Sequence, residues 1–150
     1  MAPPAIEFNK GDFVISTDPT RLDVDSMHGY LANRSYWARG IPRAILEKSN
    51  QNSLCFGVYQ GKQQVGFARV ITDYATFAYI EDVFILEEYQ GQGLGKWLLA
   101  CVREHPQLQG LRRWVLLTRD AHGLYAQAGF RPLSRPERYM EINDPDVYRR

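Results

Sequence analysis

Residues 89–96 read Tyr-Gln-Gly-Gln-Gly-Leu-Gly-Lys, so three glycines stand within eight positions. The preceding run, residues 78–86, is rich in aromatic and β-branched side chains, as is typical of a buried strand. After the glycines, apolar residues recur with helical spacing at Leu94, Leu98, Cys101 and Val102. The pattern predicts a strand, a glycine turn and a helix. Because the first amides of a helix lack internal partners and carry partial positive charge, such a turn can bind a phosphate group.

The spacing of these glycines argues against two common phosphate-binding loops. A Walker loop ending at Gly95-Lys96 would need glycine at position 90 and Ser or Thr at position 97, where this chain has Gln90 and Trp97. A dinucleotide-binding fold would need its third glycine one residue later and a carboxylate about twenty residues further on. The corresponding segment here, residues 112–117, has no carboxylate.

Three segments carry motifs of a different kind. Residues 90–95 follow the pattern Q/R-x-x-G-x-G/A, residues 81–85 read Glu-Asp-Val-Phe-Ile, and residues 123–130 contain Leu-Tyr followed by Gly-Phe. In this order and at these separations, over about residues 53–142, the chain resembles the GNAT superfamily of acetyl-CoA-dependent N-acetyltransferases. The run from 118 to 130 further resembles a bacterial-type subgroup with a TxDAHxLYxxxGF segment, whose substrates are largely undefined.

The resemblance implies that acetyl-CoA binds as a co-substrate. In the family, main-chain donors of the glycine loop hold the pyrophosphate, and the pantetheine arm lies between two parallel strands that diverge. Thr118 stands where many members carry an asparagine that bonds this arm, and Lys96 either adds charge near a phosphate or faces solvent. The implied cofactor-binding residues are Val83, Phe84, Ile85, Gln90, Gly91, Gln92, Gly93, Leu94, Gly95, Lys96 and Thr118.

Two residues are predicted to be catalytic. Tyr125 matches the family tyrosine proposed to protonate the departing thiolate, and a phenol with a pKa of about 10 is protonated at neutral pH. Glu81 and Asp82 are adjacent carboxylates on a strand that otherwise looks buried, and strand alternation would send them to opposite faces. The family precedent favours Glu81 as the base, with Asp82, His122 or a structural role for both carboxylates as alternatives.

The segment joining the first two predicted helices would form one wall of the acceptor site. Tyr36 and Trp37 lie there between Arg34 and Arg39. Aromatic rings can enclose the body of an amine, and arginines can pair with a carboxylate or phosphate. Alternatively, Trp37 anchors the loop and the arginines are solvated. Tyr36, Trp37 and Glu81 are the predicted substrate-binding residues.

A small-molecule amine with an apolar or anionic group is therefore the favoured acceptor. Two alternatives stay open, a protein acetyltransferase acting on lysine or an N-terminus, and a non-catalytic acyl-CoA sensor. Retention of both Tyr125 and a strand carboxylate argues against the sensor, because a protein that only binds acyl-CoA needs neither.

The chain is predicted to form a single GNAT domain, residues 1–150, of mixed α/β class. The resemblance implies a mostly antiparallel sheet of six to seven strands with a splayed parallel pair, flanked by about four helices. Helices are expected from Asp23 or Asp25 to Leu31, over 42–48, from the glycine loop to before Pro106, and from a cap at Asp120 to Ala128. Strands are expected at 12–16, 53–59, 64–73, 77–86, 114–118, 129–133 and 138–142.

Composition restricts the partners. Lys and Arg number 18 against 17 Asp and Glu, so no global field favours nucleic acid or an anionic membrane. With neither a signal peptide nor a membrane-spanning run in the sequence, a cytoplasmic protein is expected. Cys55 and Cys101 lie in apolar patterns, which favours reduced core thiols over a disulfide or a metal site. A homodimer is possible, although no element demands it.

Overall fold

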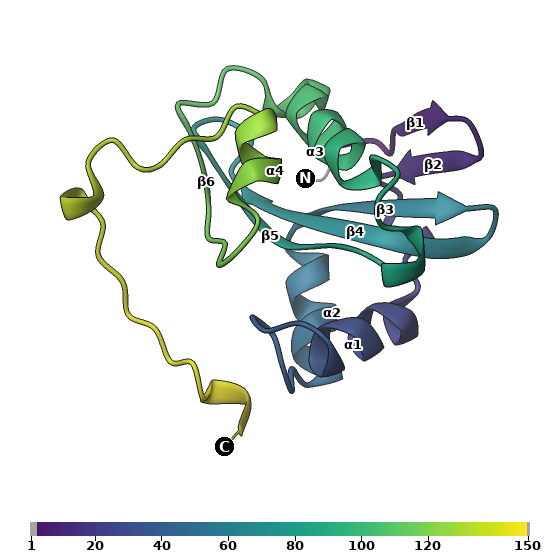
Figure 1. The fold of residues 1–150 in the computed structure, drawn as a ribbon, viewed down its shortest axis with the longest axis horizontal. Helices are drawn as coiled ribbons and strands as arrows, with labels where there is room; N and C mark the ends of the chain where they lie inside the picture. The colour runs from purple at the N-terminus through teal and green to yellow at the C-terminus, as the bar shows by residue number, and fades with distance from the viewer. Residues whose placement is uncertain (1–2, 150) are drawn as a thin grey trace.

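The computed structural model describes residues 3–149, and its central feature is a six-stranded sheet in the order β1-β2-β3-β4-β5-β6 (Figure 1). The strands are β1 (Glu7–Lys10), β2 (Phe13–Ser16), β3 (Leu54–Gln60), β4 (Gln63–Thr72), β5 (Phe77–Ile85) and β6 (Arg113–Leu116). Neighbours from β1 to β5 are antiparallel, whereas β5 and β6 are parallel. The predicted α/β class, mostly antiparallel sheet and parallel pair are confirmed.

Helices cover both faces of this sheet. They are α1 (Val24–Asn33), α2 (Arg43–Gln51), α3 (Leu94–Glu104) and α4 (His122–Gln127). In Figure 1, α1 and α2 lie on one side of the sheet and α3 and α4 on the other. Adjacent residues of β5 point into the two resulting cores, Phe84 beneath α1 and α2 and Ile85 beneath α3. No helix in residues 3–149 is long and apolar enough to cross a membrane.

Several predicted boundaries of helices and strands are confirmed. In each case a single residue at the boundary determines where the element begins or ends. The Asp23 carboxylate accepts the Ser26 amide at 3.1 Å, which starts α1. Helix α3 ends at Glu104, ahead of Pro106. A two-residue turn joins β3 to β4, and Gly61 supplies its positive φ of 59°.

The parallel strands share only part of their length. Their register runs from Phe77 opposite Arg113 to Ile80 opposite Leu116, while β5 continues to Ile85. Within the described chain, the second half of β5 therefore pairs with β4 alone. This free edge is where the family resemblance places the pantetheine arm.

Two predicted strands are wrong. Residues 129–133 and 138–142 form no strand. Phe130 packs against the core beneath α3, and from residue 131 on the chain forms an arm that stands away from the body (Figure 1), interrupted by a short 3-10 turn at Pro136–Arg138. Met140 and Ile142 on this arm are fully exposed, at 97% and 105%. Their alternating apolar pattern suits a strand, but a strand also needs a neighbour to pair with, and none lies beside them in the described chain. Conversely, β1 was not predicted, because its four residues have mostly exposed side chains.

The two cysteines are buried and unpaired, as predicted. Cys55 lies in the core beneath α1 and α2, and Cys101 in the core beneath α3, so the two thiols belong to different clusters. Burial raises the pKa of each thiol to about 12. At neutral pH both are therefore protonated core residues.

Candidate active site

The glycine loop connects β5 to α3, as predicted, and leaves its main-chain donors free. Gly91 and Gly93 have φ angles of 82° and 85°, and Gly93 is the N-cap of α3. A Cβ added to either glycine would meet no atom within 4 Å, so this side of the loop is open. Among the described residues, no acceptor faces the amides from Gly91 to Lys96. Unpaired amides at an open helix N-terminus fit the binding of a phosphate.

Side chains of the loop hold its shape. Gln90 Nε2 donates to the Ile85 carbonyl oxygen at 2.8 Å, and Gln92 Nε2 donates to the Tyr89 carbonyl oxygen at 3.1 Å. Leu94 is buried in the core beneath α3, whereas Lys96 is exposed. The predicted cofactor-binding residues of this loop therefore offer main-chain donors and an exposed cation, while both glutamines are engaged with the loop itself.

The next feature is an irregularity in the pairing of β4 with β5. Two residues of β5, Asp82 and Val83, stand opposite the single residue Ala68 of β4, and Asp82 has a φ of 54°. A bulge of this kind redirects the side chains beside it. The prediction that alternation sends Glu81 and Asp82 to opposite faces is wrong, because both carboxylates contact the same guanidinium of Arg69.

We call Arg69, Glu81, Asp82 and Trp37 the Arg69 cluster. Arg69 Nη2 lies 3.0 Å from Glu81 Oε2, and Arg69 Nε lies 2.8 Å from Asp82 Oδ2. Trp37 Nε1 donates to Asp82 Oδ1 at 2.8 Å, and Arg69 Nη1 donates to Ser53 Oγ at 3.2 Å. Trp37 thus anchors the α1–α2 loop to β5 while its ring stays 38% exposed. One cation shared by two carboxylates leaves the cluster with a formal charge of −1.

Sequence reasoning missed Arg69, although a signal was present. Arg69 is the one charged residue in the apolar run from Val65 to Ile71 of β4. A charge in a buried strand requires a partner, and Glu81 and Asp82 were the nearest candidate carboxylates on the adjoining predicted strand.

Of the two carboxylates in the Arg69 cluster, Glu81 is the one that solvent can reach. Its side chain is 30% exposed, against 4% for Asp82. Burial raises the pKa of Glu81, and the charge of Asp82 raises it further. Arg69 and a hydrogen bond with Tyr79 act in the opposite direction without cancelling the rise. A carboxylate with a raised pKa is a better proton acceptor near neutral pH than an ordinary glutamate.

Tyr125 lies on α4 and packs against the core beneath α3. Burial is the main cause that raises its pKa to about 12, and Tyr36, Asp120 and Glu81 add to the rise. The charge of Glu81 on β5 thus acts on the hydroxyl of Tyr125 on α4. The Tyr125 hydroxyl is therefore protonated throughout the neutral range and available as a proton donor.

The start of α4 differs from the prediction. The Ala121 amide donates to Thr118 Oγ1 at 3.1 Å, and the predicted cap residue, Asp120, makes no such bond. The hydroxyl of Thr118 can still donate its own hydrogen, so it can serve both the helix and a ligand. The predicted end is confirmed, because Gly129 has a φ of 99° and the Phe130 amide donates to the Tyr125 carbonyl oxygen at 3.2 Å.

Tyr36 links the α1–α2 loop to the segment that follows β6. Its hydroxyl accepts the Arg119 amide at 2.8 Å, and the Arg119 guanidinium lies 3.9 Å from the ring centroid. The Tyr36 and Trp37 rings meet edge to face with centroids 5.1 Å apart. The two predicted acceptor-wall residues therefore form one aromatic unit, held to β5 through Trp37 and to the end of β6 through Tyr36.

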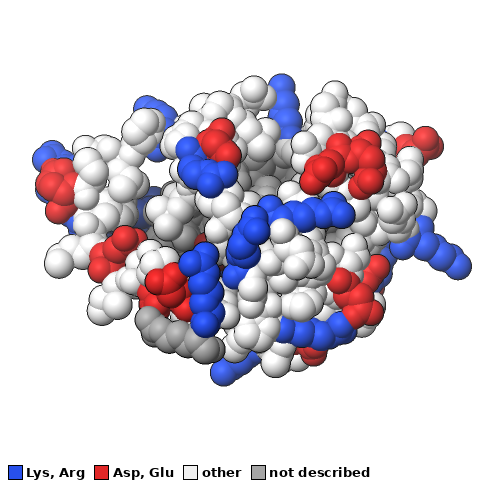
Figure 2. Space-filling view, turned by 60° about the horizontal axis from the view of Figure 1, so that its bottom comes forward, with Lys and Arg blue, Asp and Glu red and all other residues white. Residues whose placement is uncertain are grey.

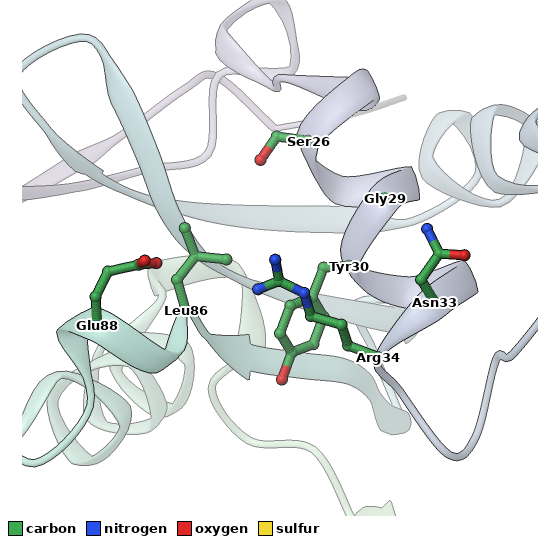
Figure 3. Close-up of a pocket in the computed structure, with 7 residues that line it drawn as sticks. All are labelled: Ser26, Gly29, Tyr30, Asn33, Arg34, Leu86 and Glu88. Carbon is green, nitrogen blue, oxygen red and sulfur yellow. The ribbon is translucent and has the colours of Figure 1, made fainter.

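A separate hollow of about 490 Å³ lies between α1 and the connection from β5 to the glycine loop (Figure 3). Arg34 and Glu88 reach into it from opposite sides. It is lined by Ser26, Gly29, Tyr30, Asn33, Arg34, Leu86 and Glu88. The hollow adjoins the glycine loop but contains neither predicted catalytic residue. Acidic and basic side chains are interspersed over the face of the molecule drawn in Figure 2, in keeping with the nearly neutral chain.

Comparison with known proteins identifies this arrangement. A family model described as an acetyltransferase (GNAT) domain matches residues 51–132, more than half of the chain, from the end of α2 past α4. The fold and the matched segment are thus those of an acetyltransferase domain. The protein belongs to the GNAT family of acetyltransferases, as the sequence motifs predicted.

Individual relatives agree with this assignment. A Gibberella zeae protein, provisionally named an acetyltransferase, is 37% identical over 142 residues, covering 80% of this chain and 79% of its own. A crystal structure from Xanthomonas campestris, assigned to the same family, is 48% identical with a TM-score of 0.89, and the match covers 91% of this chain and 96% of that one. A Deinococcus radiodurans structure shares the fold alone, at 16% identity and a TM-score of 0.72 over 95% and 96% of the two chains.

Proposed function

We propose that the protein is an acetyl-CoA-dependent N-acetyltransferase that acetylates the primary amine of a small molecule by direct attack in a ternary complex. One observation carries the proposal. Glu81 is the first residue of β5 beyond its pairing with β6, and from there the free edge of β5 leads to the open amides of the glycine loop. A proton acceptor thus lies beside the strand edge expected to hold the thioester, and Tyr125 on α4, whose pKa is raised in part by the charge of Glu81, is the candidate proton donor.

The residues present fit acetyl-CoA. Six consecutive amides, from Gly91 to Lys96, have no acceptor within the described chain and can bind the pyrophosphate, and the Lys96 ammonium adds charge. The second half of β5, which β6 leaves free, offers main-chain groups at Val83 to Ile85 for the pantetheine amides. Thr118 lies two residues beyond the end of β6, and its hydroxyl can donate to the same arm.

When bound, acetyl-CoA supplies an acetyl group activated as a thioester. Glu81 accepts a proton from the attacking amine, directly or through one water. Tyr125 donates its hydroxyl proton to the departing sulfur, which its pKa of about 12 permits at any physiological pH. Tyr36 and Trp37 enclose the body of the amine. The −1 charge of the Arg69 cluster favours an acceptor with a cationic end, in place of the anionic group that the sequence suggested.

The proposal is tested by release of CoA thiol from acetyl-CoA across a panel of small amines, amino acids and peptides. We expect turnover with one or more small amines and binding of acetyl-CoA by calorimetry. Turnover with peptides alone would assign a protein acceptor instead. Binding without turnover on any amine would favour a sensor.

Glu81→Gln should lower kcat/KM by about a hundredfold near pH 7, because the amine then loses its proton acceptor. The deficit should shrink as the pH approaches the pKa of the amine, about 10, where the substrate is already deprotonated. In the parent, the raised pKa of Glu81 should place the acidic limb of the kcat/KM profile above the pH expected for an ordinary glutamate. Glu137→Gln, on the exposed arm, is the matched control. A deficit that is constant with pH would leave Glu81 a structural role only.

Gly93→Ala should weaken acetyl-CoA binding about tenfold, because a side chain at a φ of 85° distorts the loop that presents the amides. Gly110→Ala is a matched control, since Gly110 also has a positive φ, of 77°, and an equally open surrounding but lies outside the loop. Both variants should lose about 1 kcal/mol of stability, and only the first should lose affinity in calorimetry. Equal affinities in the two variants would contradict phosphate binding at this loop.

A further inference from the structure

The chain ends in a turn that returns to the body of the protein. After the exposed arm, a short 3-10 turn at Val147–Arg149 lies beside the loop that joins α1 to α2 (Figure 1). The Arg149 amide donates to the Asp146 carbonyl oxygen at 2.9 Å, and the two side chains pair at 3.0 Å. No sequence pattern predicted this turn.

Tyr148 is the residue through which the turn contacts the body. Every residue from Arg131 to Val147 is exposed, whereas Tyr148 is half-buried. Its side chain packs against the core beneath α1 and α2, which includes Met27 and Phe84. The Tyr148 ring therefore fixes the end of the arm to the body, while further back along the arm the Tyr139 ring centroid lies 5.8 Å from the Arg113 guanidinium of β6.

The backbone of the turn also lies against the loop that carries Tyr36 and Trp37. A Cβ added to Gly40 would lie 3.8 Å from the Tyr148 carbonyl oxygen and 3.9 Å from Tyr148 Cβ. These are ordinary van der Waals distances, so the turn and the loop are packed together.

The charges of the Arg69 cluster also act on Tyr148. Burial raises the pKa of Tyr148, and the charges of Asp82 and Glu81 raise it further, while Arg69 lowers it. All three charged members of the cluster therefore act on this hydroxyl. The same carboxylate that we assign as the base, Glu81, thus has Tyr125 on one element and Tyr148 on another within its electrostatic range.

We propose that Tyr148 forms the third aromatic wall of the acceptor site, with Tyr36 and Trp37, and determines the size of the amine that reaches Glu81. The assignment rests on the proposed function. Three rings beside a net negative charge suit a compact cationic amine, whose ammonium group is attracted by both the carboxylates and the ring faces. Because the turn packs on the loop that carries the other two rings, it also limits the room for a long acceptor such as a peptide.

The test compares Tyr148→Ala, Tyr148→Phe and a chain ending at Asn143 with the parent. Tyr148→Ala and the truncation should raise the KM of the best small amine about tenfold and leave the affinity for acetyl-CoA unchanged. The ratio of kcat/KM for a bulky amine to that for the small amine should rise, and Tyr148→Phe should lie between Tyr148→Ala and the parent. Tyr139→Ala, which removes a ring from the same arm, should behave as the parent. An unchanged KM in the truncated chain overturns the assignment. So does a fall in kcat/KM that is equal for small and bulky amines.

Hydrogen exchange supplies a readout that does not depend on activity. The Ala38 amide donates to Ser35 Oγ and the Gly40 amide to the Ala32 carbonyl oxygen, both within the loop on which Tyr148 packs. Exchange of these two amides should accelerate in Tyr148→Ala and not in Tyr139→Ala. If Tyr148→Ala is active and changes neither the exchange of these amides nor the KM, the role of Tyr148 is overturned while the proposed function stands. A parent that neither binds acetyl-CoA nor acetylates any amine overturns the proposed function and the role of Tyr148 with it.

Discussion

Replacement of Tyr125 by phenylalanine should lower kcat by about 10²- to 10⁴-fold, the usual contribution of a positioned general acid. The ring and its edge-to-face contact with Phe130, at 6.1 Å between centroids, are kept, so only the hydroxyl is lost. Affinity for acetyl-CoA should stay near that of the parent, because the glycine loop and β5 are untouched. CoA-thiol release and calorimetry measure the two quantities separately.

The pH dependence of the parent gives a second check on Tyr125. With a pKa of about 12, its hydroxyl should cause no alkaline fall in kcat below about pH 11. Tyr139→Phe is the matched control, because Tyr139 lies on the exposed arm. Unaltered turnover in Tyr125→Phe would remove the acid role and leave protonation of the sulfur to solvent.

Replacement of Arg69 by methionine should lower the free energy of unfolding by about 3–5 kcal/mol, because it leaves the buried Asp82 carboxylate without its cation. Trp37 would remain as its one strong donor. Chemical denaturation of the parent, Arg69→Met, Asp82→Asn and the double variant forms a thermodynamic cycle. The double variant should be more stable than the sum of the single losses predicts, since each removes the other's unpaired charge.

The stability deficit of Arg69→Met should depend on pH with a defined sign. The pKa of Glu81 is raised in the folded protein, so protonated Glu81 favours folding below its unfolded pKa, and this contribution is lost as the pH rises through the folded pKa. Removing Arg69 takes away a cause that lowers this pKa, so it should rise further. The difference between variant and parent should therefore shrink as the pH falls through this range. A deficit that is independent of pH would show that lost packing, and not unpaired charge, causes it.

The same cluster explains why a strained residue persists in the middle of β5. Asp82 has a φ of 54°, and a non-glycine residue in the left-handed region costs about 1–3 kcal/mol unless its surroundings stabilise it. Its two carboxylate oxygens are each engaged, one by Arg69 and one by Trp37. The ion pair and the hydrogen bond thus stabilise the bulge, and the bulge in turn brings Glu81 and Asp82 to one guanidinium.

Features that depend on neighbouring residues in the chain were predictable. The glycine loop, the Asp23 cap and the two-residue turn at Gly61 follow from conformations that few residue types adopt. The family assignment followed in the same way, from the spacing of motifs such as that around Tyr125. None of these predictions depended on contacts between residues far apart in the chain.

Strand pairing limited how much of the fold could be predicted from the sequence. Residues 138–142 have the alternating apolar pattern of a strand and form none, whereas β1 has a weak pattern and forms one because β2 pairs with it. The pattern of a single segment describes its suitability for a sheet. Pairing requires a second segment whose position the pattern does not contain.

The sequence alone determined the family and the glycine loop between β5 and α3, and it named Glu81 and Tyr125 as candidate catalytic residues, because motif spacing and backbone preference are local. Only the tertiary structure decided that Glu81 and Asp82 share Arg69, that Trp37 anchors its loop to Asp82, and that Tyr148 packs on the core beneath α1 and α2. A bulge is a property of two paired strands, and the contact made by Tyr148 joins segments far apart in the chain. Neither is encoded in any one stretch of residues, so both emerge only when the chain is folded.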